Sequence, residues 1–252
     1  MELYFNKLGS GPPVIILHGF LGTSDNWITV ARHFEDRFTF YLVDQRNHGR
    51  SPHSDSHTVE DMSADLRKLI IEQGIQDPIL IGHSMGGKVI MQYSTEYPDD
   101  FNRLIVVDIA PKYYPPHHGH VFQGLNAVDI SNLTSRGQAD EQMSPYITNP
   151  ATRQFLMKNL TRKEGGLSWK PNIPVLEKAA DSIGKAIEGK AVTEKTVLFV
   201  RGSESDYILP EDRPQIKEMY PSAKILTIRD AGHWVHADQR EAFIKTLEVL
   251  MS

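Results

Sequence analysis

The sequence predicts an α/β fold, in which a doubly wound, mostly parallel sheet carries an inserted helical cap. Short apolar runs recur along the 252 residues, as expected for strands buried on both faces of a parallel sheet. Helix-length segments separate most of these runs, and this alternation is typical of doubly wound sheets. One long stretch, residues 111–191, breaks the rhythm and contains no strong strand pattern.

Six apolar runs are predicted as strands. Each is too short for a stable helix and is rich in Val, Ile, Leu and Phe, the residues that suit a buried pleated surface. The predicted strands are Val14–Leu17, Phe38–Val43, Ile79–Ile81, Arg103–Val107, Val197–Val200 and Ala223–Ile228.

Three helices of the core have clear start or periodicity signals. Thr58 and Asp61 resemble a capping box with Asp in place of Glu, and apolar residues then recur at helical spacing. A second helix is expected to start after Ser84 and to run to about Glu96, before the stop signal of a nearby proline. A third is expected over Glu241–Leu250, with one apolar stripe facing the core.

Residues 111–191 are interpreted as the inserted cap, placed between the sixth and seventh strands of the sheet. The stretch holds a Tyr-Tyr-Pro-Pro turn, a Gly-Gly pair at 165–166 and several helix-like segments. The alternative is a pair of long crossover loops, but structureless segments of that length are uncommon in compact domains. The core is then expected to consist of residues 1–110 and 192–252.

Composition excludes several classes of protein. The formal charge is −5 and no long basic run is present, which argues against a nucleic-acid partner. The chain has no cysteine, so it has no disulfide, no thiolate metal site and no cysteine nucleophile. Its first residues lack a signal-peptide pattern and no apolar run is long enough to span a membrane, so we expect a cytoplasmic location. The oligomeric state is not predicted.

A Gly-His-Ser-Met-Gly turn at residues 82–86 joins a predicted buried strand to a predicted helix. This is the context of a nucleophile elbow, in which Ser84 adopts a strained backbone and exposes its hydroxyl. Side chains at positions 82 and 86 would collide with neighbouring elements, and glycine avoids the collision. The helix after Ser84 directs its first N–H groups at an oxyanion forming there, so the Met85 N–H is one predicted oxyanion donor.

A His-Gly-Phe turn at residues 18–20 follows the first predicted strand, at the same edge of the sheet. The Phe20 N–H is therefore the second predicted oxyanion donor. A serine nucleophile needs a base, and His233 is predicted because its loop follows the last strand, giving the order serine, acid, histidine. His236 is expected to support that loop or to meet solvent.

Two carboxylates compete for the third position of this triad. Asp108 directly follows a predicted strand, whereas Asp206 follows the next strand one residue later than the usual Gly-x-x-Asp register. Both would emerge at the same edge. We favour Asp108 and keep Asp206 as the alternative acid.

Two other motifs are assigned no chemistry. The His-rich stretch 117–120 has no carboxylate cluster close by in the sequence, so no metal site is predicted. The turn-rich loop 44–51 is expected to brace the site through hydrogen bonds rather than to transfer protons.

Five segments together resemble the YbfF-type esterases, a small bacterial branch of the α/β-hydrolase superfamily. Asn47 and Lys88 are the narrower markers of that branch, whereas the serine and histidine motifs are common to the superfamily. The segments are His-Gly-Phe-Leu-Gly (18–22), Asp-Gln-Arg-Asn-His-Gly-Arg-Ser (44–51), Gly-His-Ser-Met-Gly-Gly-Lys (82–88), Val-Asp-Ile-Ala-Pro (107–111) and Gly-His-Trp-Val-His (232–236).

The resemblance implies a serine carboxylesterase that hydrolyses short- to medium-chain acyl esters, with acyl thioesters as a further class of substrate. It implies a small-molecule ester as the binding partner, no cofactor, and an acid after the sixth strand, which falls on Asp108. Acyl preference would depend on how the cap closes over Ser84, through Tyr113, Phe122, Phe155, Met157 and Trp169.

Two alternatives remain open at this point. A carbon–carbon hydrolase or lyase of the same fold, such as the small menaquinone-pathway synthase, would need basic cap residues for a carboxylate-rich substrate. A slow, ligand-sensing hydrolase relative would need an apolar patch for a protein partner. The basic residues that the cap offers are Arg136, Arg153, Lys158, Arg162 and Lys163.

Overall fold

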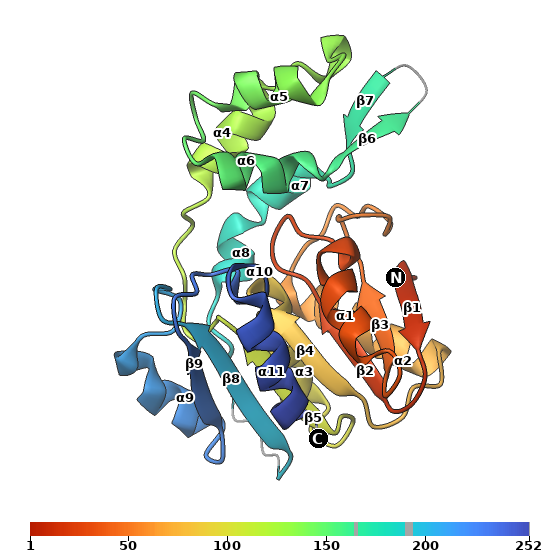
Figure 1. The fold of residues 1–252 in the computed structure, drawn as a ribbon, viewed down its shortest axis with the longest axis vertical. Coiled ribbons are helices and arrows are strands. Elements are labelled where there is room, and N and C mark those ends of the chain that lie inside the picture. The colour runs from red at the N-terminus through yellow and green to blue at the C-terminus, as the bar shows by residue number, and fades with distance from the viewer. Residues whose placement is uncertain (164–165, 190–193, 252) are drawn as a thin grey trace.

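The computed structural model describes residues 1–163, 166–189 and 194–251, and within these ranges a seven-stranded sheet runs through the molecule (Figure 1). The strand order is β1-β3-β2-β4-β5-β8-β9, and all neighbours are parallel except the edge pair β1–β3. The strands are β1 (Phe5–Gly9), β2 (Pro13–Leu17), β3 (Thr39–Val43), β4 (Ile79–His83), β5 (Arg103–Val107), β8 (Thr196–Gly202) and β9 (Lys224–Ile228).

All six predicted strands are confirmed. Within this sheet, β1 is the strand that was not predicted. Its residues are half-buried or exposed and include Asn6 and Lys7, so it lacks the apolar run that marks the other strands. It pairs in antiparallel register with β3, where Lys7 lies opposite Tyr41. An edge strand of this kind carries a weak sequence signal because only part of it is buried.

Helices cover both faces of the sheet, as a doubly wound fold requires. The prediction of a helix after Thr58 is confirmed, and the Thr58 hydroxyl accepts a hydrogen bond from the Asp61 N–H. The predicted helices after Ser84 and near the C-terminus are also confirmed, the latter starting one residue early. The core helices are α1 (Ile28–Phe34), α2 (Val59–Glu72), α3 (Met85–Glu96), α9 (Arg213–Met219), α10 (Val235–Asp238) and α11 (Arg240–Leu250), with 3₁₀ turns η1 (Ser24–Trp27) and η3 (Pro210–Asp212).

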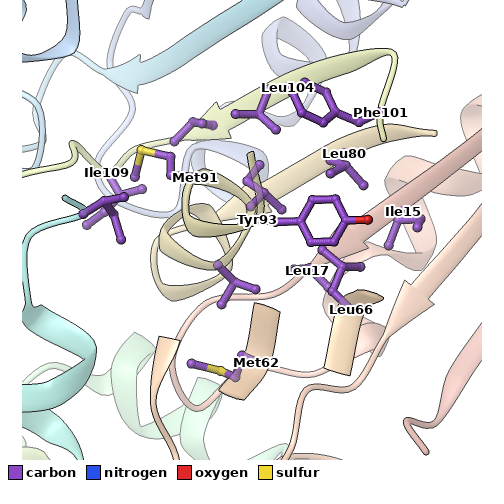
Figure 2. Packing of buried hydrophobic residues seen from close by; sticks show 14 of the residues in the cluster. Ile15, Leu17, Met62, Leu66, Leu80, Met91, Tyr93, Phe101, Leu104 and Ile109 are labelled. Atoms are coloured by element: carbon purple, nitrogen blue, oxygen red, sulfur yellow. The ribbon is translucent and has the colours of Figure 1, made fainter. Parts of the chain in front are cut away.

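The sheet separates two apolar cores because alternate residues of each strand face opposite sides. In β2, Val14 and Ile16 pack with α1 and α11, whereas Ile15 and Leu17 pack with α2 and α3. Figure 2 shows the second of these cores, where Tyr93 of α3 lies beside Leu17. Fully burying a leucine stabilises the fold by about 1.5–3 kcal/mol relative to leaving it exposed. The strand ends that carry the site are therefore held from both sides.

The helical cap lies between β5 and β8, the fifth and sixth strands of the sheet in chain order. The placement between a sixth and a seventh strand was therefore wrong, because residues 1–110 contribute only five strands. The residues expected at its second boundary, 191 and 192, lie outside the described residues, as does Gly165. The elements of the cap are α4 (Gly119–Ala127), η2 (Ile130–Asn132), α5 (Arg136–Met143), α6 (Pro150–Met157), β6 (Leu160–Lys163), β7 (Gly166–Trp169), α7 (Ile173–Lys178) and α8 (Ala180–Gly184).

The cap has a small core of its own and rests on the end of the sheet that carries the site (Figure 1). Residues of α4, α5, α6 and α7 form this third apolar cluster, and Leu21 from the loop after β2 completes it. The Asn159 side-chain N–H donates to the Leu21 carbonyl at 2.8 Å, and the Asn172 N–H donates to the Asn47 carbonyl at 3.0 Å. The pair β6–β7 was not predicted, because its strands, Leu-Thr-Arg-Lys and Gly-Leu-Ser-Trp, contain no apolar run.

Candidate active site

Ser84 lies in a sharp turn between β4 and α3. Its φ is 50° and its ψ is −115°, a region that residues with a side chain rarely adopt. A Cβ at Gly82 would lie 2.3 Å from the Gly86 carbonyl oxygen, and one at Gly86 would lie 2.4 Å from the Leu17 carbonyl oxygen. The expected collisions at both glycines are therefore present, and they explain how the turn becomes tight enough to present the Ser84 hydroxyl.

The predicted oxyanion donors lie on the two segments that meet at Ser84. Met85 is the first residue of α3, and its N–H has no hydrogen-bond partner among the described residues; the same holds for the Phe20 N–H. A Cβ at Gly19 would come within 3.3 Å of the Ser84 Cβ, so the Phe20 loop lies directly against the serine. Both predicted donors therefore belong to segments that lie next to Ser84.

Two neutral histidines brace the loop that carries Phe20. His18 donates from Nδ1 to the Gly19 carbonyl at 2.8 Å and accepts the Gln45 N–H at Nε2 at 3.0 Å. His48 accepts the Leu21 N–H at Nε2 at 3.1 Å and donates from Nδ1 to the Arg46 carbonyl at 2.9 Å. Burial lowers the pKa of His18 to about 4 and that of His48 to about 3. The loop 44–51 thus braces the site through hydrogen bonds, as expected.

His233 is hydrogen-bonded to Asp108, which is fully buried. The His233 Nδ1–H donates to Asp108 Oδ2 at 2.8 Å. The carboxylate also accepts the Gly202 N–H at 3.1 Å and the Ser205 hydroxyl. Three hydrogen-bond donors fix the position of the buried Asp108 carboxylate. Because this carboxylate accepts the Nδ1–H of His233, it also fixes the imidazole tautomer, and the unprotonated Nε2 lies on the side of the ring away from Asp108.

The alternative acid, Asp206, is not brought to His233. Its side chain is exposed, and the neighbouring Ser205 is the residue of that loop that contacts the buried carboxylate. The extra residue before Asp206 turns Ser205 inward and Asp206 outward. The structure therefore pairs His233 with Asp108.

Two further histidines pack around His233 and are not placed to transfer its proton. His83 donates from Nε2 to the His233 carbonyl at 2.8 Å. His236 stacks on Trp27, with ring centroids 4.2 Å apart. Burial lowers the pKa of His236 to about 3 and keeps the pKa of His83 well below its usual value. His236 thus supports the loop, which is one of the two roles expected for it.

Tyr207 is a site residue that the sequence did not indicate. Its ring stacks on the His233 imidazole, with centroids 3.7 Å apart and planes 18° apart. Its hydroxyl donates to His117 Nε2 at 2.7 Å, and Tyr114 stacks on it at 5.4 Å. A tyrosine two residues after a buried serine has no sequence signature of such a role.

Lys88 is buried one turn after Ser84, and it bonds to both segments that connect the cap to the core. Its ammonium group donates to the Lys112 carbonyl at 2.5 Å and to the Lys185 carbonyl at 2.7 Å. It also lies 5.1 Å from the centroid of the Tyr114 ring. Burial, together with the charge of Lys112, lowers the pKa of Lys88 to about 7. The marker residue Lys88 thus links the helix of Ser84 to the cap.

Two pockets adjoin Ser84 in the described part of the chain. The larger, with a cavity volume of about 100 Å³, is lined by His233, Trp234 and Phe155 among others. The smaller, with a cavity volume of about 40 Å³, is lined by Met85 and Lys88 among others. Of the cap residues expected to set acyl preference, Phe155 lines the larger pocket. Phe122, Met157 and Trp169 belong to the apolar cluster of the cap, and Tyr113 is exposed and bonded to Asp181.

No group of three or more His, Asp or Glu side chains placed to hold a metal ion is found among the described residues. In the His-rich stretch, His117 instead accepts from Tyr207, and His118 packs at 5.1 Å from the Phe20 ring.

Among the helices of residues 1–163, 166–189 and 194–251, none is both long and apolar enough to cross a membrane.

Comparison with known proteins shows the family of this chain. A sequence model described as the alpha/beta hydrolase fold matches residues 12–239. The chain belongs to the α/β-hydrolase family. The prediction of an α/β-hydrolase fold is therefore confirmed.

Relatives of this α/β-hydrolase are named esterases and lipases. It is 36% identical over 241 residues to sn-1-specific diacylglycerol lipase ABHD11 of Mus musculus, and the aligned region covers 92% of this chain and 78% of that protein. It is 32% identical over 237 residues to esterase YbfF of Escherichia coli (strain K12), and the aligned region covers 93% of this chain and 91% of that esterase. A solved marine microorganism esterase is 45% identical, with a TM-score of 0.95 and 98% of both chains covered. The predicted resemblance and the prediction of a hydrolytic enzyme are confirmed.

Proposed function

We propose that this α/β-hydrolase is a serine carboxylesterase that works through an acyl-enzyme on Ser84. The observation that carries the proposal is the bond from His233 Nδ1 to the buried Asp108, beside a serine held in a strained turn. Such a carboxylate orients the imidazole and stabilises the imidazolium that forms when the serine attacks.

In the proposed mechanism, His233 Nε2 takes the proton of the Ser84 hydroxyl as the oxygen attacks the ester carbonyl. The carbonyl oxygen becomes an oxyanion that accepts from the Phe20 and Met85 N–H groups. His233 then protonates the departing alcohol, which leaves the acyl group on Ser84. Water, deprotonated by His233, attacks this acyl-enzyme and releases the carboxylic acid. No cofactor takes part.

The proposed substrates are small-molecule esters of short- to medium-chain acids, with acyl thioesters as a further class. The surface of both pockets beside Ser84 is mostly apolar, which favours hydrocarbon groups on the substrate. The names of the relatives, an esterase and a diacylglycerol lipase, support an acyl ester. We also propose that residues 111–191 act as the cap and the remainder as the catalytic core.

The test is labelling by a serine-directed fluorophosphonate, combined with p-nitrophenyl butyrate hydrolysis. We expect stoichiometric labelling of Ser84 and loss of hydrolysis in Ser84→Ala, with the fold retained by circular dichroism. A Ser84→Ala variant that keeps the full esterase rate would overturn the proposal. A turnover number in the ordinary range, about 1–10³ per second, would exclude a slow ligand-sensing relative.

The contacts of the cap's basic residues do not favour a carbon–carbon hydrolase. Arg153 is paired with Asp140 at 2.8 Å, and Arg136 donates to the Leu160 carbonyl. Arg162 lines a separate surface hollow and Lys158 an outer groove, neither of which contains Ser84. The side chain of Lys163 lies outside the described parts of the structure. Two of these cations are thus already occupied and two lie away from the serine.

A further inference from the structure

Ser84 lies where the two pockets meet. The acyl part and the alcohol part of a bound ester can therefore each extend into a different pocket. Both pockets are lined by Ser84, Phe20, His118 and Tyr207. Beyond these shared residues they diverge: one extends along the His233 loop and α6, and the other extends past Met85 toward α8. The acyl part and the alcohol part of an ester leave the carbonyl carbon on different sides, and each needs one of these spaces.

The position of His233 distinguishes the two directions. His233 lines the larger pocket, whereas the described residues that line the smaller one do not include it. The alcohol oxygen must receive a proton from His233 as it departs, so it has to lie on the side of the imidazole. The acyl chain then has to lie on the other side of Ser84.

We propose that the smaller pocket is the acyl subsite and that the larger pocket holds the alcohol. This assignment rests on the proposed esterase mechanism, because it uses His233 as the proton donor to the leaving group. It predicts that acyl-chain length and alcohol size are controlled by different residues. Since the acyl pocket is the smaller, with a cavity volume of about 40 Å³ against about 100 Å³, the assignment also predicts that the size of the acid is more tightly limited than the size of the alcohol.

The walls of the smaller pocket suit a hydrocarbon chain without charge. Ile109, Ile183, Ala180 and Pro115 supply apolar surface. The ammonium group of Lys88 also borders this pocket, but it donates to two carbonyls and lies over the Tyr114 ring. A cation satisfied in this way has little left to offer a substrate carboxylate, so we assign the pocket to linear, unsubstituted acyl groups.

The far wall of the pocket is rigid because α8 and the Tyr114 segment are in direct contact. A Cβ at Gly184 would lie 2.2 Å from the Tyr114 carbonyl oxygen, so this close approach depends on glycine. Ile183, on α8, is buried and faces both the pocket and the core. Shortening Ile183 should therefore lengthen the chain that the pocket accepts.

The experiment measures kcat/KM for two substrate series on purified full-length variants. One series is p-nitrophenyl acetate, butyrate, hexanoate and octanoate, and the other is the acetates of ethanol, butanol, hexanol and octanol. We expect Ile183→Ala to raise the octanoate-to-acetate ratio about tenfold, since each buried methylene is worth a few-fold in binding, and to leave the alcohol series unchanged. Ala180→Leu, which fills the same pocket, should lower that ratio.

The matched control is Val121→Ala, because Val121 lines the larger pocket and not the smaller. It should change the preference for the alcohol and leave the acyl ratio as in wild type. The reverse pattern, or an acyl ratio that neither Ile183→Ala nor Ala180→Leu changes, would overturn the subsite assignment while ester hydrolysis persists. Failure of the proposed function is distinct, since the wild-type protein would then hydrolyse neither series.

Discussion

At the residue scale, the pairing of Asp108 with His233 makes the two candidate acids separable by experiment. Asp108→Asn should lower kcat by about 10⁴-fold, because an amide can hold the wrong imidazole tautomer and cannot stabilise the imidazolium. Asp206→Asn replaces an exposed side chain and should change kcat by no more than about twofold. Steady-state kinetics on both variants checks this. Equal losses in the two would contradict the pairing seen here.

Tyr207 should act as a positioning residue for His233. Its ring covers one face of the imidazole at 3.7 Å, and an aromatic face favours the imidazolium formed during catalysis. Tyr207→Leu should therefore lower kcat by about two- to tenfold, which steady-state kinetics on the purified variant measures.

Tyr207→Phe is the control for that prediction, because it keeps the stacked ring and removes only the hydrogen bond to His117. It should retain the wild-type kcat. If the leucine and phenylalanine variants lose kcat equally, the stacking has no role in positioning the base.

Local sequence identified some of these residues and could not identify others. Ser84 and Phe20 were recognised because glycines and adjoining strand ends lie beside them in the chain. The choice between Asp108 and Asp206 depends on which carboxylate reaches a histidine more than 100 or about 30 positions away, and no local pattern encodes that. The contacts of Tyr207 and Lys88 are equally distant in sequence, so their roles became visible only in three dimensions.

At the scale of elements, buried strands and amphipathic helices were predictable because their apolar periodicity is strong. β1 and the pair β6–β7 were missed because they lack an apolar run and are only partly buried, so their pairing is decided by neighbours rather than by their own residues. The position of the cap in the strand count was wrong for a related reason, since short runs alone do not reveal how many strands a sheet contains.

Lys88, which links the cap to α3, should make the free energy of unfolding depend on pH in the alkaline range. Lys88 has a pKa of about 7 when folded against a usual value of 10.5, so the unfolded chain binds more protons between these limits. The free energy of unfolding of wild type should therefore rise relative to Lys88→Met, by about 1.4 kcal/mol per pH unit above pH 7.

Urea denaturation of both proteins at several pH values between 7.5 and 9 measures this difference. Lys68→Met is a suitable control because Lys68 is exposed on α2, where it forms an ion pair with Glu72. A wild-type advantage over Lys88→Met that stays constant with pH would show that Lys88 does not lose its proton in the folded state.

At the scale of the whole molecule, buried histidines make the fold sensitive to acid. Burial lowers the pKa of His18 to about 4 and those of His48, His118 and His236 to about 3. Below pH 6.5 the unfolded chain takes up protons at these positions and the folded chain does not. Each histidine should then remove about 1.4 kcal/mol of stability per pH unit, down to its folded pKa.

Chemical denaturation at pH 7.5, 6 and 5 should show this steep loss, and His48→Gln should make it shallower. His33→Gln, which replaces an exposed histidine on α1, should leave the slope as it is. A stability that does not change between pH 7.5 and 5 would be incompatible with neutral buried imidazoles.

The backbone of Ser84 has a consequence for protein engineering. With a φ of 50°, a residue that has a Cβ is strained here by about 1–3 kcal/mol, whereas glycine is not. Ser84→Gly should therefore melt at a higher temperature than Ser84→Ala, the opposite of the order that these residues show within helices. A screen for thermostability alone would thus favour loss of the nucleophile, and selections on this scaffold should score turnover and melting temperature together.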